Sequence, residues 1–439
     1  MLGLKLLQSA LNELSSKGRR KKFTAEQLTA RVSSIKTPSE RVSLKNADLS
    51  GEWLCGLFLQ GAKLSGSLLD NTNLSGSNLD RADMVGIQAI EADFDQATMN
   101  ESNLRSSIMR GSSMQGARLS KSDLSGCDMS HVSAREADFS GASMVEVDLS
   151  QSDIDRSAMV GIDARGARFP LEMVEVDMRD ANLEKTDLRG RRMVRCDVRG
   201  ARFTSSDMRE IDLTSTDVRK CEFRACQLSG ARLPNDLSGT SFSDIDLRDV
   251  DVRGKVMSRC TLTGCHLPLD LSGTDLSGVD LGDIDLSGLD LRETVLKGSN
   301  LSRCKLSGVQ LPLDLSGCDL SGVDLSGRDF ASFSLSNANL SRSNLSRSNL
   351  TGCKLSGCKL SGAQLPLDLS GCDLSGVDLT GRDLTGFNFS NANLSSANLS
   401  NTNLSNTNLS ETNLSNTNLS ETNLSNANLS NANLSNANL

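Results

Sequence analysis

Residues 336–350 read SNANLSRSNLSRSNL, with Leu340, Leu345 and Leu350 separated by four small or polar residues each. Apart from five shortened steps, this spacing extends over Leu44–Leu439 and defines 81 centres, of which 78 are Leu, Met, Phe, Val or Ile. Five residues advance an α-helix by about 500°, so the centres would spiral around a helix. A flat strand alternates with a period of two and fails as well. The spacing therefore predicts a chain that turns a corner every five residues and points each centre inward.

The residues around each centre agree with such a corner. Two positions before the centre the sequence has mostly Ala, Ser, Thr, Val or Cys, and in strand geometry this position shares the inward side of the centre. Directly before the centre stand polar residues such as Asp246, Asn339 and Lys354, which we expect to face water. After the centre come residues that suit a tight turn, as in Ser316 and Gly317.

The runs Ala47-Asp48-Leu49-Ser50-Gly51 and Ala338-Asn339-Leu340-Ser341-Arg342 resemble the A(D/N)LXX unit of the pentapeptide-repeat family, and the resemblance covers about nine-tenths of the chain. It implies an all-β solenoid, a right-handed quadrilateral β-helix with four pentapeptides per coil, over residues 44–439. We therefore expect about twenty coils, stacked over about 95 Å at the usual strand spacing. The Asn- and Ser-rich residues 385–439 keep the period, so we predict coil there too, with Asn side chains stacked as ladders.

Five steps take four residues instead of five, and each has a proline directly after a centre. The prolines are Pro170, Pro234, Pro268, Pro312 and Pro366. The spacing of these breaks predicts that they alternate between two neighbouring corners. One interpretation of the short steps is a tolerated one-residue deletion that was copied by duplication of segments. The other is a bend in the rod or a ridge that faces a partner.

Residues 1–43 differ from the rest and carry nine Lys or Arg against three Asp or Glu. A first helix is expected on Leu4, Leu7, Leu11 and Leu14, and a second after a capping box at residues 24–27. The segment is interpreted as a cap over the first coil or as a docking arm for an acidic partner, membrane surface or nucleic acid. The docking residues would be Arg19, Arg20, Lys21 and Lys22.

No enzymatic activity is expected from the sequence. Eleven of the twelve cysteines lie two positions before a centre, and only Cys55 lies elsewhere. This position predicts buried free thiols that bind no metal. Buried reduced thiols in turn suggest an intracellular, cytoplasmic setting. His131 and His266 are far apart in the repeat and form no catalytic group. No phosphate-binding loop, signal peptide or membrane span is predicted, and no cofactor is expected.

Two classes of function remain. The first is a non-enzymatic rod-like scaffold that mediates protein–protein interaction within a larger assembly, including the special cases of a bacterial effector or virion component. The second follows from the resemblance: some family members mimic DNA and bind type II topoisomerases such as gyrase. Residues 236–330 hold 16 acidic against 9 basic residues, which gives mimicry some support. Direct nucleic-acid binding is not expected of the whole chain, whose net charge is −8.

The last coil is a further candidate interface. Its apolar end and strand edges predict stacking against a second copy, giving an end-to-end homodimer, or docking into a larger complex. The residues expected there are Asn433, Asn438 and Leu439.

Overall fold

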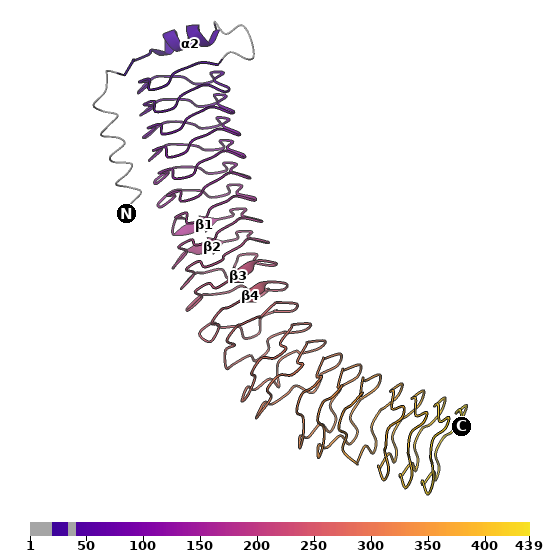
Figure 1. Ribbon diagram of the computed structural model, residues 1–439. Coiled ribbons are helices and arrows are strands. Elements are labelled where there is room, and N and C mark those ends of the chain that lie inside the picture. Colours follow the sequence, from indigo (N-terminus) through magenta and orange to yellow (C-terminus); the bar gives the residue numbers. More distant parts are fainter. Residues whose placement is uncertain (1–19, 34–40) are drawn as a thin grey trace. The chain divides into compact units, whose positions relative to one another are not determined.

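The computed structural model describes residues 20–33 and 41–439. The chain divides into two compact units, with unit 1 formed by Met1–Cys221 and Ala225–Arg232 and unit 2 by Glu222–Arg224 and Leu233–Leu439. The labelled elements are one helix and four short strands (Figure 1). They are α2 (Ala25–Ser33), β1 (Glu172–Val174), β2 (Arg192–Val194), β3 (Glu222–Arg224) and β4 (Ser241–Ser243).

Within each unit the chain winds in coils of four five-residue steps. Most pairings are single parallel bridges between residues 20 apart, such as Asp48 with Leu68, and the centre Leu49 donates its amide to the Leu68 carbonyl at 2.9 Å. The centres are almost all buried, Ala89, Ala134 and Ala164 included. The predicted inward direction of the centres is confirmed, because stacked coils hide one apolar column from water.

Each corner is a tight turn that starts at a centre. The amide of Glu52 donates to the carbonyl of Leu49 at 3.2 Å, and Gly51 between them has a φ of +75°. A positive φ at this position is typical of a type II turn and favours Gly or Asn. Asn46 occupies the equivalent corner with a φ of +55°. The turn residues that the sequence repeats therefore form the corners.

The five shortened steps change the pairing offset locally. Across the first break, Ala158 pairs with Asp177 and Asp163 with Asn182, which are 19 residues apart instead of 20. Counting steps along the pairings within unit 2, its four breaks alternate between two adjacent corners, as predicted. The regular strands follow the same stacking, because β1 pairs with β2 in unit 1 and β3 with β4 in unit 2, both in parallel.

The expectation that a small side chain points inward two positions before a centre is wrong at some positions. Leucines that follow a proline lie two before a centre, yet they are exposed, as at Leu171, which is 70% exposed. A step of four leaves no room for both residues inside, and the buried proline takes the inward place. Long side chains also occupy the position two before a centre, as at Arg191, Arg328 and Arg382.

The helix α2 belongs to unit 1 and begins at a capping box. The Gln27 amide donates to Thr24 Oγ1 at 3.4 Å, and the Thr24 amide donates to Gln27 Oε1 at 3.3 Å. Leu28 is fully buried, whereas Val32 is half-buried. The expected first helix lies outside the described residues. In the part of the chain that the structure describes, no helix combines the length and apolar character required to cross a bilayer.

Candidate functional site

Many of the inward polar side chains hydrogen-bond one coil to the next. Ser67 Oγ donates to the carbonyl of Leu44 at 2.6 Å, and Thr412 Oγ1 donates to the carbonyl of Phe389 at 2.8 Å, in each case 23 residues back. The acceptor is the carbonyl of a centre, which also accepts the amide of its own turn. A buried carbonyl has two lone pairs, so this second bond completes its hydrogen bonding. These hydroxyls therefore serve the fold rather than chemistry.

The cysteines take part in the same interior pattern. Cys127 Sγ donates to the Leu104 carbonyl at 2.9 Å, and burial raises the pKa of the Cys127 thiol to about 12. Ten of the eleven repeat cysteines are buried, Cys265 is half-buried, and Cys55 is exposed. Cys265 departs from the prediction of burial. It lies two positions before Leu267, which is a centre next to a break and is itself half-buried. A thiol with a raised pKa is a poor nucleophile and a poor metal ligand at neutral pH.

Within residues 20–33 and 41–439, no three His, Cys, Asp or Glu side chains gather in a way that would hold a metal ion. His131 and His266 are both exposed, and His131 lies at a corner with a φ of +61°. His266 pairs through its backbone with Asp246 one coil earlier. His266 stands directly before the centre Leu267, and it faces water as expected of that position.

The outer faces of unit 1 carry aspartate–arginine ladders. Asp177, Asp197 and Asp217 follow one another on successive coils, and the arginine two residues after each aspartate binds it. Arg179 Nη2 lies 2.7 Å from Asp177 Oδ2, and its Nε lies 3.8 Å from Asp197 Oδ2 in the next coil. Arg199 continues the ladder to Asp217 at 3.5 Å. Stacked carboxylates would otherwise repel each other, so the arginines neutralise the column.

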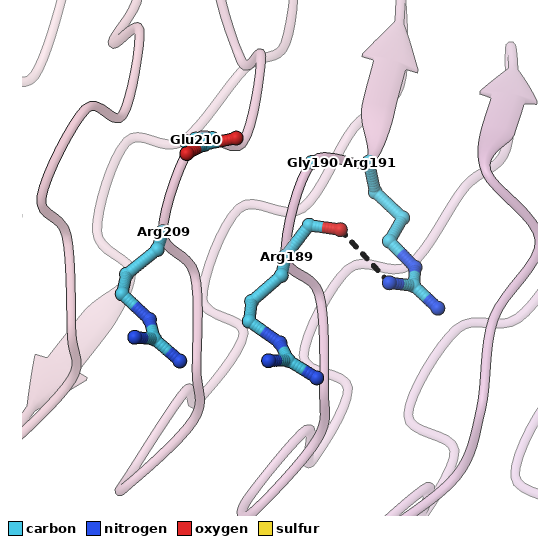
Figure 2. A pocket seen from close by; sticks show the side chains of 5 residues that line it. All are labelled: Arg189, Gly190, Arg191, Arg209 and Glu210. Atoms are coloured by element: carbon cyan, nitrogen blue, oxygen red, sulfur yellow. Dashed lines mark hydrogen bonds between the residues drawn. The ribbon is translucent and has the colours of Figure 1, made fainter.

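A shallow depression of about 440 Å³ lies beside a second ladder (Figure 2). In Figure 2 the side chains of Arg189 and Arg209 run parallel, one coil apart, while Arg191 donates to the Arg189 carbonyl at 2.8 Å. The hydrogen bond from Arg189 lowers the pKa of Asp187 to about 2. Arg189 Nε also lies 3.3 Å from Asp207 Oδ2. The guanidinium charges that border the depression are therefore largely engaged by carboxylates.

The outer faces of unit 2 alternate carboxylates with other residues. The bridged pairs Asp246 with His266, Asp275 with Val295, Asp285 with Lys305 and Asp324 with Asn344 show the pattern. Asp270 pairs with Asp290 instead, and Arg292 Nη2 lies 2.6 Å from Asp290 Oδ2. The acidic residues of 236–330 are therefore distributed among neutral and basic neighbours in these columns.

The Asn-rich coils form the ladders that the sequence predicts. Asn413 Nδ2 donates to Asn393 Oδ1 at 3.0 Å, and Asn433 Nδ2 donates to Asn413 Oδ1 at 3.2 Å. Asn413 Oδ1 also accepts the amide of Ser415 at 3.1 Å. Each asparagine thus joins two coils and holds its own corner.

The predicted docking residues at the N-terminal end lie next to the first coil, except Arg19, which is outside the described residues. The Asp48 amide donates to the Lys21 carbonyl at 3.0 Å, and the Phe23 amide donates to the Asp48 carbonyl at 3.2 Å. Lys21 and Lys22 are exposed, and Arg20 is half-buried. The backbone here pairs with the coil while the lysine side chains face water.

The predicted C-terminal interface residues are solvent-facing. Asn433 and Asn438 are exposed, and Leu439 is 76% exposed. Asn438 Nδ2 donates to Asn418 Oδ1 at 3.0 Å, so the asparagine column reaches this coil. The stacking interface itself stays a prediction.

Coils of four short steps, an apolar column inside and side-chain ladders outside define a β-helix solenoid repeat protein. The family model "Pentapeptide repeats (8 copies)" matches more than half of the chain. The matched residues are 59–96, 90–126, 135–169, 177–219, 196–235, 270–308, 334–365, 372–410 and 407–439. The chain belongs to the pentapeptide-repeat family, whose fold is the right-handed β-helix.

Several solved structures are similar. HetL, a pentapeptide repeat protein involved in heterocyst differentiation regulation from the cyanobacterium Nostoc sp., is 19% identical, with a TM-score of 0.26, over 56% of this chain and 98% of HetL. QnrB1, a plasmid-mediated fluoroquinolone resistance protein, is 22% identical, with a TM-score of 0.27, over 52% of this chain and 92% of its own. Rfr23, from the cyanobacterium Cyanothece, is 32% identical, with a TM-score of 0.17, over 28% of this chain and 91% of its own. None of the curated proteins matches the sequence.

Proposed function

We propose that this protein is a non-enzymatic scaffold whose outer faces bind other proteins within a larger assembly. The observation that carries the proposal is the pattern of ladders on the outer surface: the ladder aspartates of residues 177–219 are paired with arginines in unit 1, and most bridged aspartates of unit 2 alternate with neutral or basic residues. Most inward hydroxyls and thiols donate to backbone carbonyls, so the outside is where a partner would bind. An intracellular location is part of the proposal, since reduced buried thiols suit a reducing compartment.

The alternative, a DNA mimic that binds a type II topoisomerase, is less well supported. A mimic requires long runs of carboxylates comparable to a phosphate backbone, with about one negative charge per 1.7 Å of duplex. Pairs such as Asp246 with His266 and Asp285 with Lys305 interrupt such a run. An effector or virion component would be a special case of the scaffold.

The experiment is affinity capture of the tagged full-length protein from cells of its own organism, followed by mass spectrometry. We expect a stoichiometric protein partner. A parallel supercoiling assay with purified gyrase tests the alternative. Inhibition at equimolar protein, together with a topoisomerase as the captured partner, would replace the scaffold with the mimic.

The role of residues 20–33 is a second part of the proposal. We infer that they cap the first coil, because the bonds of Lys21 and Phe23 to Asp48 run through the backbone and Glu52 Oε2 accepts the Ala25 amide at 2.8 Å. A docking arm would instead depend on the lysine charges. The variant Lys21→Glu/Lys22→Glu should therefore keep the stability of the first coils, and loss of partner capture in this variant would identify docking.

A further inference from the structure

Three of the five register breaks share one sequence and one geometry in unit 2. Residues 267–271, 311–315 and 365–369 all read LPLDL. In each, the proline is buried and the following leucine points outward. The exposed fractions are 84% for Leu269, 64% for Leu313 and 64% for Leu367. Single exposed leucines are common on protein surfaces, but these three recur at one structural position.

A second apolar residue lies one coil above each exposed leucine. These residues, 20 positions later, are Leu289, which is buried, and Phe333 and Phe387, which are half-buried. The Ser334 amide donates to the Leu313 carbonyl at 2.8 Å, which places Phe333 beside Leu313 at the strand spacing of about 4.8 Å. The repeat normally has a small residue at this position. We call each exposed leucine with the large residue one coil above it a notch.

A hollow lies next to the middle notch and shares Phe333 with it, whereas Leu313 does not line it. A depression of about 260 Å³ is lined by the apolar residues Val309, Leu311, Phe330 and Phe333, and by Arg292, Gln310, Arg328 and Asp329. Phe330 and Phe333 contact edge to face, with ring centroids 5.2 Å apart.

An arginine holds the wall of this depression in place. Arg328 Nη1 donates to the Val309 carbonyl at 2.8 Å, and Nη2 donates to the Leu306 carbonyl. Arg382 makes the equivalent bond to Leu360 at 2.9 Å below the third notch. Beside the second and third notches the coil is therefore tied to the coil beneath it, and binding there would cost little ordering of the protein.

Each exposed leucine is followed directly by a carboxylate. Asp270 and Asp368 each accept a backbone amide two residues ahead, from Ser272 and Ser370, at 3.0 Å. Asp314 accepts the Ser316 amide in the same way. These bonds hold a carboxylate beside each exposed leucine, and at the first notch Arg253 Nη1 lies 3.9 Å from Asp270 Oδ2. A second copy of the same notch would bring like charges together, whereas a basic partner would be attracted.

The break at residues 233–237 serves as a natural comparison within unit 2. Asn235 stands where the notches have leucine, and Lys255 stands one coil above. The Val256 amide donates to the Asn235 carbonyl at 2.8 Å, which is the bond that Leu313 makes with Ser334. Lys255 Nζ donates to the Leu233 carbonyl at 3.0 Å. The shortened step therefore accepts a polar pair, and the backbone does not require the leucines.

We propose that the three notches of unit 2 bind a partner protein through apolar side chains flanked by Lys or Arg. The inference rests on the proposed scaffold function and specifies its surface. Leu269 and Leu367 lie on the same corner, twenty repeat steps apart, which makes five coils and about 24 Å. A partner helix covers that distance in about 16 residues. One helix could then reach two notches.

The test uses a synthetic 24-residue amphipathic helical peptide of Leu and Lys, with matched Leu/Glu and Ser/Lys peptides, and fluorescence anisotropy with the full chain. The test variant is Leu269→Asn/Leu313→Asn/Leu367→Asn, which introduces the residue type that the comparison break already carries at Asn235. The matched control is Val256→Asn/Val295→Asn, which removes outward valines that are 38% and 48% exposed. We expect the triple variant to bind the Leu/Lys peptide at least tenfold more weakly than the wild type, and the control variant to change this affinity less than twofold. Equal weakening, or equal binding of the Leu/Glu peptide, would overturn the proposal.

Two further measurements keep the outcomes separate. The variant Asp270→Asn/Asp314→Asn/Asp368→Asn keeps the backbone bonds and removes only the charge. It should reduce the affinity for the peptide less than the leucine variant does, and it should make that affinity less dependent on salt. If circular dichroism shows that the leucine variant misfolds, this charge variant decides, and an unchanged affinity overturns the proposal. In the affinity capture, a folded leucine variant that retains all partners would contradict binding through the notches but would not contradict the proposed scaffold function. Absence of any specific partner of the wild type would overturn both.

Discussion

A substitution at Leu281 tests the inward and outward register most directly. Leu281 is a centre of unit 2 with 1% of its surface exposed, and Asp280 stands directly before it on the outside. Truncating a buried leucine to alanine costs about 2–5 kcal/mol, since the transfer term and the cavity add. We therefore expect Leu281→Ala to destabilise its coil by that amount.

The matched change is Asp280→Asn. Asp280 Oδ1 accepts the Gly282 amide at 3.0 Å and Asn300 Nδ2 at 2.6 Å. An asparagine oxygen accepts the same two bonds, as Asn393 does from Asn413 and Ser395. Only the charge contribution is lost, so we expect a change below about 1 kcal/mol.

Amide hydrogen exchange measured by mass spectrometry reads out both variants. The reporting amides are those of Leu281, which donates to Asn300 at 2.8 Å, and Asn300, which donates to Val279 at 2.9 Å. Since about 1.4 kcal/mol corresponds to a tenfold change, Leu281→Ala should speed exchange there by about 30-fold or more. Coils contact only their neighbours, so the effect should fade within a few coils. Equal effects of the two variants, or a uniform effect along unit 2, would refute the register.

Other predictions concern thiols, charge and the asparagine ladder. A bulky thiol reagent should label Cys55 within minutes and buried thiols such as Cys127 far more slowly, and rapid labelling of many thiols by mass spectrometry would contradict the packing. The pKa of Asp187 is lowered to about 2, so its stabilising effect is complete above its unfolded value of about 3.9 and is lost as the pH falls toward 2. Arg189→Ala should move that loss to higher pH in a carboxyl-carbon NMR titration, and an unchanged pKa would exclude the ion pair as the cause. Asn413→Val removes a donor and an acceptor, whereas Asn413→Asp keeps the acceptor, so thermal melts should rank Val as the more damaging.

Much of the coil could be predicted from residues close in sequence. The centres, the polar positions before them and the turn residues recur every five residues, and a corner depends only on about four consecutive residues. For the same reason the exposure of Cys55 and the burial of ten other cysteines could be predicted. The five breaks are visible as a proline and a missing residue.

The direction of the leucines at the breaks was decided by the tertiary structure. Leu313 lies two before a centre, where the repeat points inward, and it is nevertheless 64% exposed. Pro312 takes the inward place because four residues cannot supply two inward side chains at that corner. The large residue one coil above, Phe333, is 20 positions away, so no local pattern connects it with Leu313.

The charge pattern of the surface likewise depends on pairing. Composition makes residues 236–330 acidic, with 16 carboxylates, and by itself gives a DNA mimic some support. Stacking sets Asp285 beside Lys305 and Asp246 beside His266, which composition cannot reveal. The sequence determined what each five-residue step looks like, because a step is a local object. Only the stacking of coils decided which side chains meet, because neighbours across coils are 20 residues apart, or 19 where a pair spans a short step.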